Sequence, residues 1–276
     1  MPASKIRMVV TDLDGTLLNA DRCISATDEA TLRWLGEQHV CRVAATGRSL
    51  YSAQKVLSDL SPIDYLIFSC GAGIVNWPAK DLLLAISLSP EDVARITHFL
   101  HQQRLDFQIL DPVPESHKMV YYQGNHCHPD FLRRLEHYRE FAQMITFPPA
   151  KFAPACEVLV ILNADLAVYA MIAQELSDYK VIRATSPLDS QSLWVEIFAR
   201  QVSKGNAAAW LCTRLGCHPE SVMAIGNDYN DLDLLHWAAQ SFVVANAPED
   251  LKSRFKTTRS HNENGFTEAV HRMLLT

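Results

Sequence analysis

The sequence predicts a doubly wound α/β protein whose parallel sheet is interrupted by an inserted α+β domain. Short apolar runs rich in β-branched residues alternate with helical patterns near both ends of the chain, which is typical of strands buried on both faces of a parallel sheet. Between these two regions the rhythm changes, and predicted strands follow one another in pairs. The length of 276 residues also fits about two domains.

The first segment alternates strands and helices. The run IRMVVT shows no alternation of polar and apolar residues and leads into a turn at Gly15, and Ser25 begins a pattern with leucines at helical spacing. Parallel strands in this order require right-handed crossovers through the helices. The predicted elements, strand and helix in turn, are 6–11, 25–38, 41–46, 47–60 and 64–70.

The inserted α+β domain is predicted over 81–186, and the doubly wound core over 1–80 and 187–276. The predicted strands of the insert are 82–88, 106–111, 117–123, 157–163 and 180–185, and its predicted helices are 90–103, 128–141 and 164–177. After 194–200 the first rhythm resumes, with predicted helices over 202–216, 231–238 and 248–255 and strands over 221–227 and 241–246.

Composition excludes several classes of function. The net charge is −6 and no basic tract interrupts it, which disfavours binding to nucleic acid or to an anionic membrane. No apolar run is long enough to span a bilayer, and no secretory signal is expected. The seven cysteines are scattered and include no C-x-x-C pair, which indicates reduced thiols and a cytoplasmic protein. We expect a monomer or a weak homo-oligomer, and a solvated loop rather than a zinc site at His126-Cys127-His128.

The strongest functional signal is the run DLDGTL, which directly follows the first predicted strand. Ligands of doubly wound sheets bind at the carboxyl ends of the strands, and Asp12 and Asp14 lie at such an end. Two carboxylates one residue apart repel each other, and a divalent cation relieves that repulsion. The competing interpretation is a solvated turn with a helix cap.

Three further signals follow other predicted strands or open a helix. Thr46 precedes a predicted helix, where its hydroxyl can donate to a phosphoryl oxygen. Lys204 lies in the first turn of a predicted helix. A cation is unfavourable there because it lies at the positive end of the helix macrodipole, and binding an anion is a reason for a lysine at this position. The run GNDYND over 226–231 carries acidic and amide groups that can complete a magnesium site. A plain helix cap and an Asn/Asp turn are the simpler alternatives.

In this order the motifs DLDGTLL, ATGRS, VSKG and GNDYND resemble those of the haloacid dehalogenase (HAD) superfamily. The likeness covers essentially the whole chain and is strongest to the Cof-type (class IIB) sugar-phosphatase branch. It implies a Rossmann-like core with an inserted cap domain for substrate specificity. It also implies Mg²⁺-dependent hydrolysis of a small phosphate monoester, a sugar phosphate or a related metabolite.

The resemblance also implies roles for individual residues. Asp12 would be the nucleophile that forms an aspartyl-phosphate, and Asp14 the general acid and base. Thr46 and Lys204 would hold the phosphoryl oxygens. The metal ligands would come from Asp12, Asp14, Asn227, Asp228 and Asp231. The other residues that would contact phosphate or substrate are Thr16, Leu17, Gly47, Arg48, Gly71, Asn230 and Asn246.

Two departures from the family pattern leave alternatives open. Asn227 stands where the family usually has Asp, so the ligating side chain is Asn227, Asp228 or Asp231. Cys70 stands where this branch often has Asn, which weakens any transfer of substrate identity. Asn246 is alternatively a turn residue. A phosphosugar mutase or phosphotransferase, and a catalytically weak protein that binds a phosphometabolite, remain the alternative functions.

Overall fold

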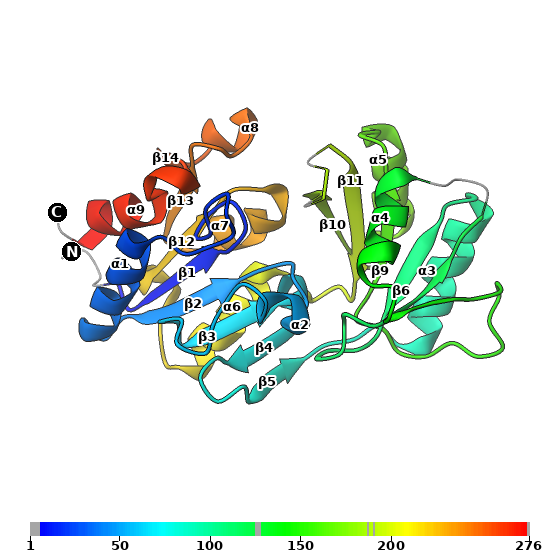
Figure 1. Cartoon of the computed structure of the whole chain (residues 1–276), viewed down its shortest axis with the longest axis horizontal. Helices are drawn as coiled ribbons and strands as arrows, with labels where there is room; N and C mark the ends of the chain where they lie inside the picture. Colours follow the sequence, from blue (N-terminus) through cyan, green and yellow to red (C-terminus); the bar gives the residue numbers. More distant parts are fainter. Residues whose placement is uncertain (1–5, 125–127, 187, 190, 275–276) are drawn as a thin grey trace. The chain divides into compact units, whose positions relative to one another are not determined.

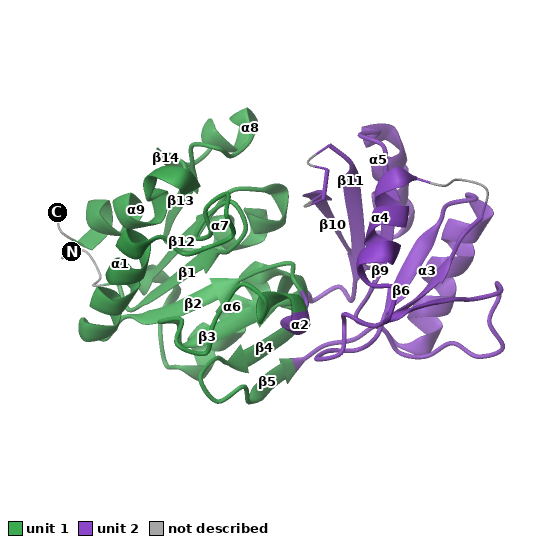
Figure 2. Cartoon of the chain, viewed as in Figure 1, with its two compact units in different colours: residues 1–48, 52–84, 203–276 green, residues 49–51, 85–202 purple. Residues whose placement is uncertain are grey.

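The computed structural model describes residues 6–124, 128–186, 188–189 and 191–274, so His126 and Cys127 lie outside the described residues. The chain divides into two compact units (Figure 2). Unit 1 comprises Met1–Arg48, Ser52–Leu84 and Ser203–Thr276, and unit 2 comprises Ser49–Tyr51 and Ala85–Val202. Unit 1 is therefore assembled from both ends of the sequence.

The centre of unit 1 is an eight-stranded sheet with the order β14-β13-β12-β1-β2-β3-β4-β5 (Figure 1). Its strands are β1 (Met8–Asp12), β2 (Cys41–Ala45), β3 (Tyr65–Phe68), β4 (Gly73–Asn76), β5 (Leu82–Ala85), β12 (Val222–Gly226), β13 (Gln240–Val244) and β14 (Lys256–Thr258). The six strands from β14 to β3 are parallel, and β4 pairs antiparallel with β3. The parallel, doubly wound core predicted from the sequence is confirmed.

Helices cover this sheet because its strands are apolar on both faces. The helices of unit 1 are α1 (Ala26–Glu37), α6 (Lys204–Arg214), α7 (Leu232–Trp237), α8 (Glu249–Lys252) and α9 (Gly265–Leu274). The side chains of α6 and α7 pack against Met8 and Val10 of β1. Helices α1 and α9 lie side by side, α1 next to β2 and α9 next to β13 and β14 (Figure 1).

The predicted helix over 47–60 is wrong in extent. Only α2 (Leu50–Ala53) is helical, because the chain then continues in turns, with Lys55 and Val56 donating to carbonyl groups three residues earlier. Strands β4 and β14 and helix α9 were not predicted from the sequence. Strand β4 was missed because the turn at Ser69–Gly71 returns the chain antiparallel to β3, whereas alternating elements suggested only parallel strands.

Unit 2 is a six-stranded sheet with the order β10-β11-β9-β6-β7-β8. Its strands are β6 (Phe107–Leu110), β7 (Met119–Tyr122), β8 (Ala142–Met144), β9 (Glu157–Leu162), β10 (Lys180–Thr185) and β11 (Leu193–Phe198), and its helices are α3 (Pro90–Gln102), α4 (Pro129–His137) and α5 (Leu166–Glu175). Strands β6 and β7 form the antiparallel pair that the sequence predicts. Phe131 and Tyr138, in and after α4, pack against Leu159 and Trp194 of the sheet.

The second boundary between the units falls after Val202, later than the predicted boundary at 186/187. Strand β11, which the sequence analysis assigned to the core, pairs antiparallel with β9 and with β10 in unit 2. A buried apolar strand has the same sequence pattern in either sheet, so only its hydrogen-bonded neighbours show to which sheet it belongs.

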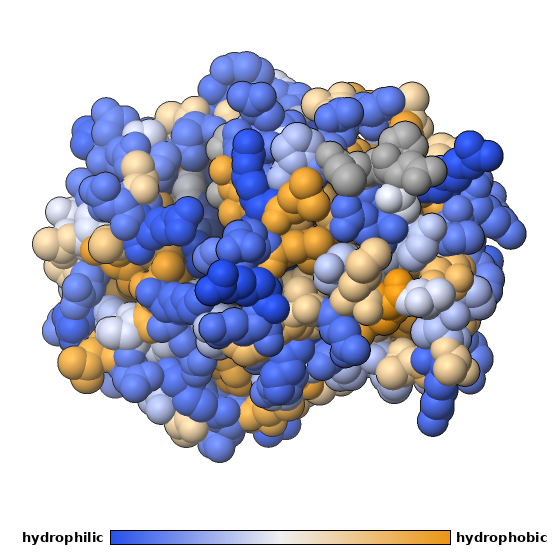
Figure 3. Space-filling model, turned by 45° about the vertical axis from the view of Figure 1, so that its right-hand side comes forward, coloured by the Kyte–Doolittle hydropathy of each residue, from blue (hydrophilic) through white to orange (hydrophobic). Residues whose placement is uncertain are grey.

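Hydrophilic side chains cover much of the face of the molecule in Figure 3, and hydrophobic side chains form smaller areas between them. The large hydrophobic residues that are exposed are dispersed along the sequence: Leu60, Leu82, Leu132, Met144, Leu166 and Leu188. Among the described residues, no helix combines the length and the apolar character needed to cross a membrane.

Candidate active site

The candidate site lies at the carboxyl edge of the sheet in unit 1. Strand β1 lies between β12 and β2, so the chain order reverses at β1, and β1 and β12 end there at Asp12 and Gly226. Such a reversal is where open α/β sheets bind ligands. All fourteen site residues predicted from the sequence lie in unit 1.

Lys204 is the centre of the site. Its Nζ donates to Asp12 Oδ1 at 2.6 Å, to Asp231 Oδ1 at 2.6 Å and to Asn230 Oδ1 at 3.2 Å. Lys204 is fully buried, and burial alone would lower the pKa of its ammonium group. The carboxylates of Asp12 and Asp231 outweigh burial and raise that pKa above its usual value, so Lys204 is a cation.

Asp12 is also buried, with 4% of its surface exposed. Burial and the negative charges of Asp231 and Asp14 together raise the pKa of its carboxyl group to about 8, against the opposing positive charge of Lys204. Additional positive charge beside Asp12 therefore favours the ionised form that a nucleophile needs.

The amide of Asn227 identifies oxygens that could hold a metal ion. With its nitrogen turned toward them, the amide lies 3.2 Å from Asp12 Oδ2, from the backbone carbonyl of Asp14 and from the Thr16 hydroxyl. Carboxylate, carbonyl and amide oxygens are the ligands that Mg²⁺ and Ca²⁺ accept. Turning the amide over would direct its oxygen toward a cation held by Asp12 and Asp14. The donor set therefore fits a divalent metal.

Asp228 and Asp231 shape the loop that carries Asn227. Asp231 Oδ2 accepts from the backbone N–H groups of Asn227 at 2.8 Å and of Asp228 at 3.1 Å, and Asp228 Oδ1 accepts from the N–H of Tyr229 at 2.8 Å. Both oxygens of Asp231 are thus bonded within the protein. Within the described part of the chain, no cluster of three or more His, Cys, Asp or Glu side chains is arranged to hold a metal.

Asp14 and Arg48 form a second ion pair at this edge. Arg48 Nη2 donates to Asp14 Oδ1 at 2.6 Å and Arg48 Nε donates to Asp14 Oδ2 at 2.7 Å. Such a two-point contact fixes the plane of the carboxylate. The exposed fractions are 17% for the Arg48 side chain and 40% for that of Asp14, so the pair is open to solvent on the side of Asp14.

Thr46 and Gly47 bring the end of β2 into the same site. Thr46 is buried, and its hydroxyl accepts from the N–H of Arg48 at 3.1 Å. A Cβ atom at Gly47 would lie 3.3 Å from Cys70 Sγ and 3.6 Å from the amide nitrogen of Asn230. The glycine therefore keeps the backbone close to both side chains.

Gly71 is required by two features of its surroundings. Its φ of +105° is strained for any other residue, and a Cβ atom there would clash with the carbonyl oxygen of Ser203. Ser203 caps α6, with its hydroxyl accepting from the N–H of Asn206, and Lys204 follows as the first residue of the helix. Gly71 thus lets the β3–β4 turn pack against the helix start that carries Lys204.

Cys70 belongs to the site, although the sequence analysis noted it only as a departure from the family pattern. It is buried, has a φ of +53°, and lies near enough to Lys204 to influence the pKa of that ammonium group. Gly71 and Gly73, which end this turn and follow it, were the available signal in the sequence.

Thr16, Leu17 and Asn246 hold the loop that follows β1. Thr16 and Leu17 are buried, and the N–H of Leu17 donates to the carbonyl of Asp12 at 3.3 Å. Asn246 Nδ2 donates to the carbonyl of Gly15 at 2.8 Å, and Asn246 Oδ1 accepts from the N–H of His261 at 3.0 Å. Asn246 therefore connects the loop after β13 to the loop after β1. No feature of the sequence predicted its contact with His261.

A doubly wound sheet with a buried lysine between carboxylates at its switch point defines a Rossmann-like α/β enzyme. The chain matches the family described as haloacid dehalogenase-like hydrolase over residues 9–270, and it belongs to that family. The resemblance noted in the sequence is thereby confirmed.

Related proteins agree with this assignment. A putative phosphatase of Bacillus subtilis (strain 168), YxeH, is 26% identical over 280 residues, covering 98% of each chain. YwtE of the same organism, a 5-amino-6-(5-phospho-D-ribitylamino)uracil phosphatase, is 22% identical over 290 residues, again covering 98% of each chain. A solved HAD subclass IIB sugar phosphatase has the same fold, with a TM-score of 0.77 at 17% identity, covering 96% of this chain and 98% of the other. The chain is a phosphatase of this family.

Proposed function

We propose that this protein hydrolyses a small phosphate monoester, a sugar phosphate or related metabolite, through an aspartyl-phosphate on Asp12. The observation that carries the proposal is the contact of 2.6 Å between the buried Asp12 carboxylate and the buried Lys204 ammonium group at the switch point of the sheet. A carboxylate attacks a phosphate dianion only where nearby cations cancel their repulsion.

In the first step Asp12 attacks the phosphorus and the bond from phosphorus to the leaving oxygen breaks. Asp14 gives a proton to that oxygen, so the leaving group departs as a neutral alcohol. The ion pair with Arg48 occupies both oxygens of Asp14, so it must open before Asp14 can carry that proton. Lys204 and the Thr46 hydroxyl hold the phosphoryl oxygens during the transfer, and Lys204 gives up one of its three hydrogen bonds to do so.

In the second step a water molecule attacks the phosphorus of the aspartyl-phosphate. Asp14 takes a proton from that water, the bond from phosphorus to the Asp12 oxygen breaks, and inorganic phosphate leaves with the Asp12 carboxylate restored. One carboxyl group therefore acts as the acid in one step and as the base in the other. The phosphoryl group ends on water, which separates this reaction from that of a mutase, where a sugar hydroxyl would take it.

The cofactor that we propose is Mg²⁺, held by the Asp12 carboxylate, the backbone carbonyl of Asp14 and the side-chain oxygen of Asn227. When bound, it supplies positive charge between the nucleophile and the phosphate. The support is the set of oxygens that surrounds the Asn227 amide at 3.2 Å. Asn227 brings one negative charge fewer than an aspartate, so we expect the metal to bind more weakly than at an all-carboxylate site.

We propose unit 2 as the cap that selects the leaving group. One protein named above is a 5-amino-6-(5-phospho-D-ribitylamino)uracil phosphatase and another is a sugar phosphatase, so similar proteins act on different leaving groups. The proposed partner is a single small phosphorylated metabolite, the proposed location is the cytoplasm, and the protein is proposed to work as a monomer or a weak homo-oligomer.

The test is a screen for phosphate release over a panel of phosphometabolites, with and without Mg²⁺, using the wild-type protein and Asp12→Asn. We expect release with Mg²⁺ from one or a few phosphorylated sugars or related compounds. We expect loss of at least about 10³-fold in kcat for Asp12→Asn, because an amide is not a nucleophile. Asp81→Asn, at an exposed position of the same unit, is the matched control and should keep full activity.

Other results would change the proposal. Isomer formation without phosphate release would identify a mutase. Binding of a phosphometabolite with no turnover would identify a binding protein. An Asp12→Asn variant with near-normal turnover would exclude the covalent mechanism.

A further inference from the structure

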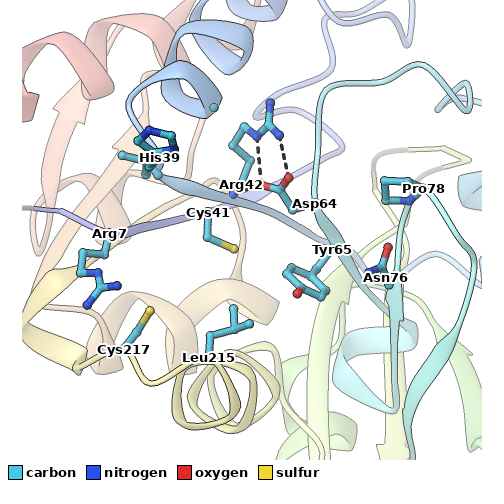
Figure 4. A pocket seen from close by; sticks show the side chains of 12 residues that line it. Arg7, His39, Cys41, Arg42, Asp64, Tyr65, Asn76, Pro78, Leu215 and Cys217 are labelled. Carbon is cyan, nitrogen blue, oxygen red and sulfur yellow. Dashed lines mark hydrogen bonds and ion pairs between the residues drawn. The ribbon is translucent and has the colours of Figure 1, made fainter.

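A pocket of about 460 Å³ opens at the amino edge of the sheet in unit 1 (Figure 4). Arg7 directly precedes β1, and Cys41 and Tyr65 are the first residues of β2 and β3. Parallel strands begin at the edge opposite to the one at which they end, so this pocket and the candidate active site lie at opposite edges of the same sheet. Leu215 and Cys217, which follow α6, complete its lower wall.

Among the described residues that line the pocket, Asp64 is the one carboxylate, and Arg42 compensates its charge. Asp64 Oδ1 accepts from Arg42 Nη2 at 2.6 Å, and Asp64 Oδ2 accepts from Arg42 Nε at 3.0 Å and from the Arg42 backbone N–H at 2.8 Å. Figure 4 shows this two-point ion pair beside the pocket. The positive charge of Arg42 therefore compensates the negative charge of Asp64, which weakens the repulsion between Asp64 and an anion.

The other polar groups in the wall are donors with unused capacity. The Arg7 side chain is exposed, and within the described ranges it makes no ion pair or hydrogen bond. The Tyr65 hydroxyl likewise donates to no other group described in the structure, and burial raises its pKa, so it is a neutral donor. The Asn76 amide oxygen accepts from the N–H of Ala79 at 3.5 Å, which leaves the Asn76 amide nitrogen as a donor.

The Cys41 thiol adds no negative charge to the pocket. Burial and the neighbouring Asp64 together raise the pKa of Cys41 to about 12, so Cys41 is a neutral thiol at physiological pH. The net formal charge of the wall is set by Arg7, because Arg42 and Asp64 cancel each other. The pocket is thus positive and rich in hydrogen-bond donors.

We propose that this pocket binds a small organic anion whose carboxylate or phosphate group pairs with Arg7 and whose polar atoms accept from Tyr65 and Asn76. The volume is within the range of small-molecule sites and exceeds what a bare phosphate ion fills, so the ligand has an organic body. Pro78 and Leu215 provide the apolar contacts for that body. Neither the hydrolytic chemistry nor the fourteen predicted site residues involve this edge of the sheet.

Cys217 makes the proposal measurable, because it lines the pocket and is partly exposed. The experiment follows alkylation of individual cysteines by iodoacetamide with peptide mass spectrometry, in metal-free buffer. The two probes are citrate, which carries carboxylates, and phenylphosphonate, which has a phosphate-like group that a phosphatase cannot hydrolyse. Cys23, which is exposed and does not line the pocket, serves as the internal control.

We expect at least one probe to slow the alkylation of Cys217 about tenfold at ten times its Kd, while Cys23 reacts at an unchanged rate. Arg7→Gln should abolish this protection, and Tyr65→Phe should weaken it. Arg139→Gln, at a 72% exposed arginine of unit 2, should leave it intact. Circular dichroism melting of each variant establishes that the fold is retained.

The two probes distinguish a carboxylate from a phosphate ligand. The proposal is overturned where neither probe protects Cys217, or where protection persists in Arg7→Gln. A phosphonate that also occupies the active site does not confuse the result, because Cys217 lies at the opposite edge of the sheet.

Discussion

Each unit contains a buried cluster of two carboxyl groups and one cation, and the two clusters treat these charges differently. In unit 1 Lys204 donates directly to Asp12 and to Asp231, and all three side chains are at least 94% buried. In unit 2 the corresponding groups are Glu157, Glu196 and Arg134, with the two glutamates 5% and 6% exposed.

The cation of unit 2 is directed elsewhere. Arg134 Nε donates to Gln108 Oε1 at 2.7 Å, and Glu157 Oε2 has no hydrogen-bond partner among the residues that the structure describes. Burial and the neighbouring Glu196 raise the pKa of Glu157 well above its usual value, and Arg134 only partly opposes them. The comparison shows that burial raises the pKa of a carboxyl group in both clusters, and that in unit 1 a cation bonded directly to both carboxyl groups opposes this effect.

The largest effect is expected from Lys204→Met, which removes the cation of the unit 1 cluster. We expect kcat to fall about 10²- to 10³-fold, because the transferring phosphoryl group loses a charged hydrogen-bond donor. We also expect a loss of about 3–5 kcal/mol in the free energy of unfolding, because Asp12 and Asp231 are left buried without their partner. Phosphate release and urea denaturation measure the two effects.

Lys118→Met is the matched control for that variant. Lys118 is 47% exposed and pairs with Glu115 at the surface, so its loss should leave the free energy of unfolding nearly unchanged. Equal stability of the two variants would show that the unit 1 cluster is not held together by its charges.

Gly71→Ala tests whether the turn beside Lys204 positions it. The added Cβ atom would clash with Ser203 and would occupy a strained backbone conformation, so we expect a loss of about 3 kcal/mol in the free energy of unfolding. We also expect kcat to fall at least about tenfold, because Ser203 immediately precedes Lys204.

Gly216→Ala separates the effect of backbone strain from the effect of the steric clash with Ser203 that is expected in Gly71→Ala. Gly216 has a φ of +65° and no atom within 4 Å of the added Cβ, so only the backbone strain of about 1 kcal/mol is expected. A Gly71→Ala variant that behaves like Gly216→Ala would exclude the packing role of that turn.

Glu157→Gln tests the unpaired carboxyl group of unit 2. The folded-state pKa of Glu157 is raised, so its contribution to stability is fully present below the unfolded pKa of about 4.5 and is lost as the pH rises toward the folded pKa. Within that window the wild type should lose about 1.4 kcal/mol per pH unit through this group, and the variant should not. The variant should therefore be the more stable protein at pH 8.

Hydrogen–deuterium exchange of the β9 and β11 peptides at pH 6 and pH 8 measures this difference within unit 2. Glu175→Gln, at an exposed position of α5, is the control and should follow the wild type at both pH values. A pH dependence that survives in Glu157→Gln would assign it to another group.

The smallest effect is expected from Asn227→Asp, which adds a carboxylate to the unit 1 site. If the side chain at this position holds the metal, the Mg²⁺ concentration for half-maximal activity should fall about tenfold, because ligand charge strengthens the site. An unchanged metal titration would direct attention to Asp228 or Asp231. Asp228→Asn, measured in parallel, provides the comparison.

Local sequence patterns predicted many helices and strands of unit 1, because the signals for each lie within its own residues and their immediate neighbours. The strand at 6–11 and the helix at 25–38 are recognisable from apolar periodicity and from the cap at Ser25, and both are present. The helix at 47–60 was overestimated, and β11 was assigned to the wrong sheet in the sequence analysis, because turn hydrogen bonds and strand partners leave no mark on periodicity.

Runs of neighbouring residues were enough to predict the class of the protein, the doubly wound core and the chemistry-bearing motifs, because each of these is local in the sequence. Folding adds contacts that no local pattern contains: Lys204 reaches across 192 positions to Asp12, Arg48 closes on Asp14, and Arg7 lines a pocket with no motif of its own. The physical reason is that such contacts are made where distant segments meet at the two edges of one sheet, and each segment alone carries only half of the contact.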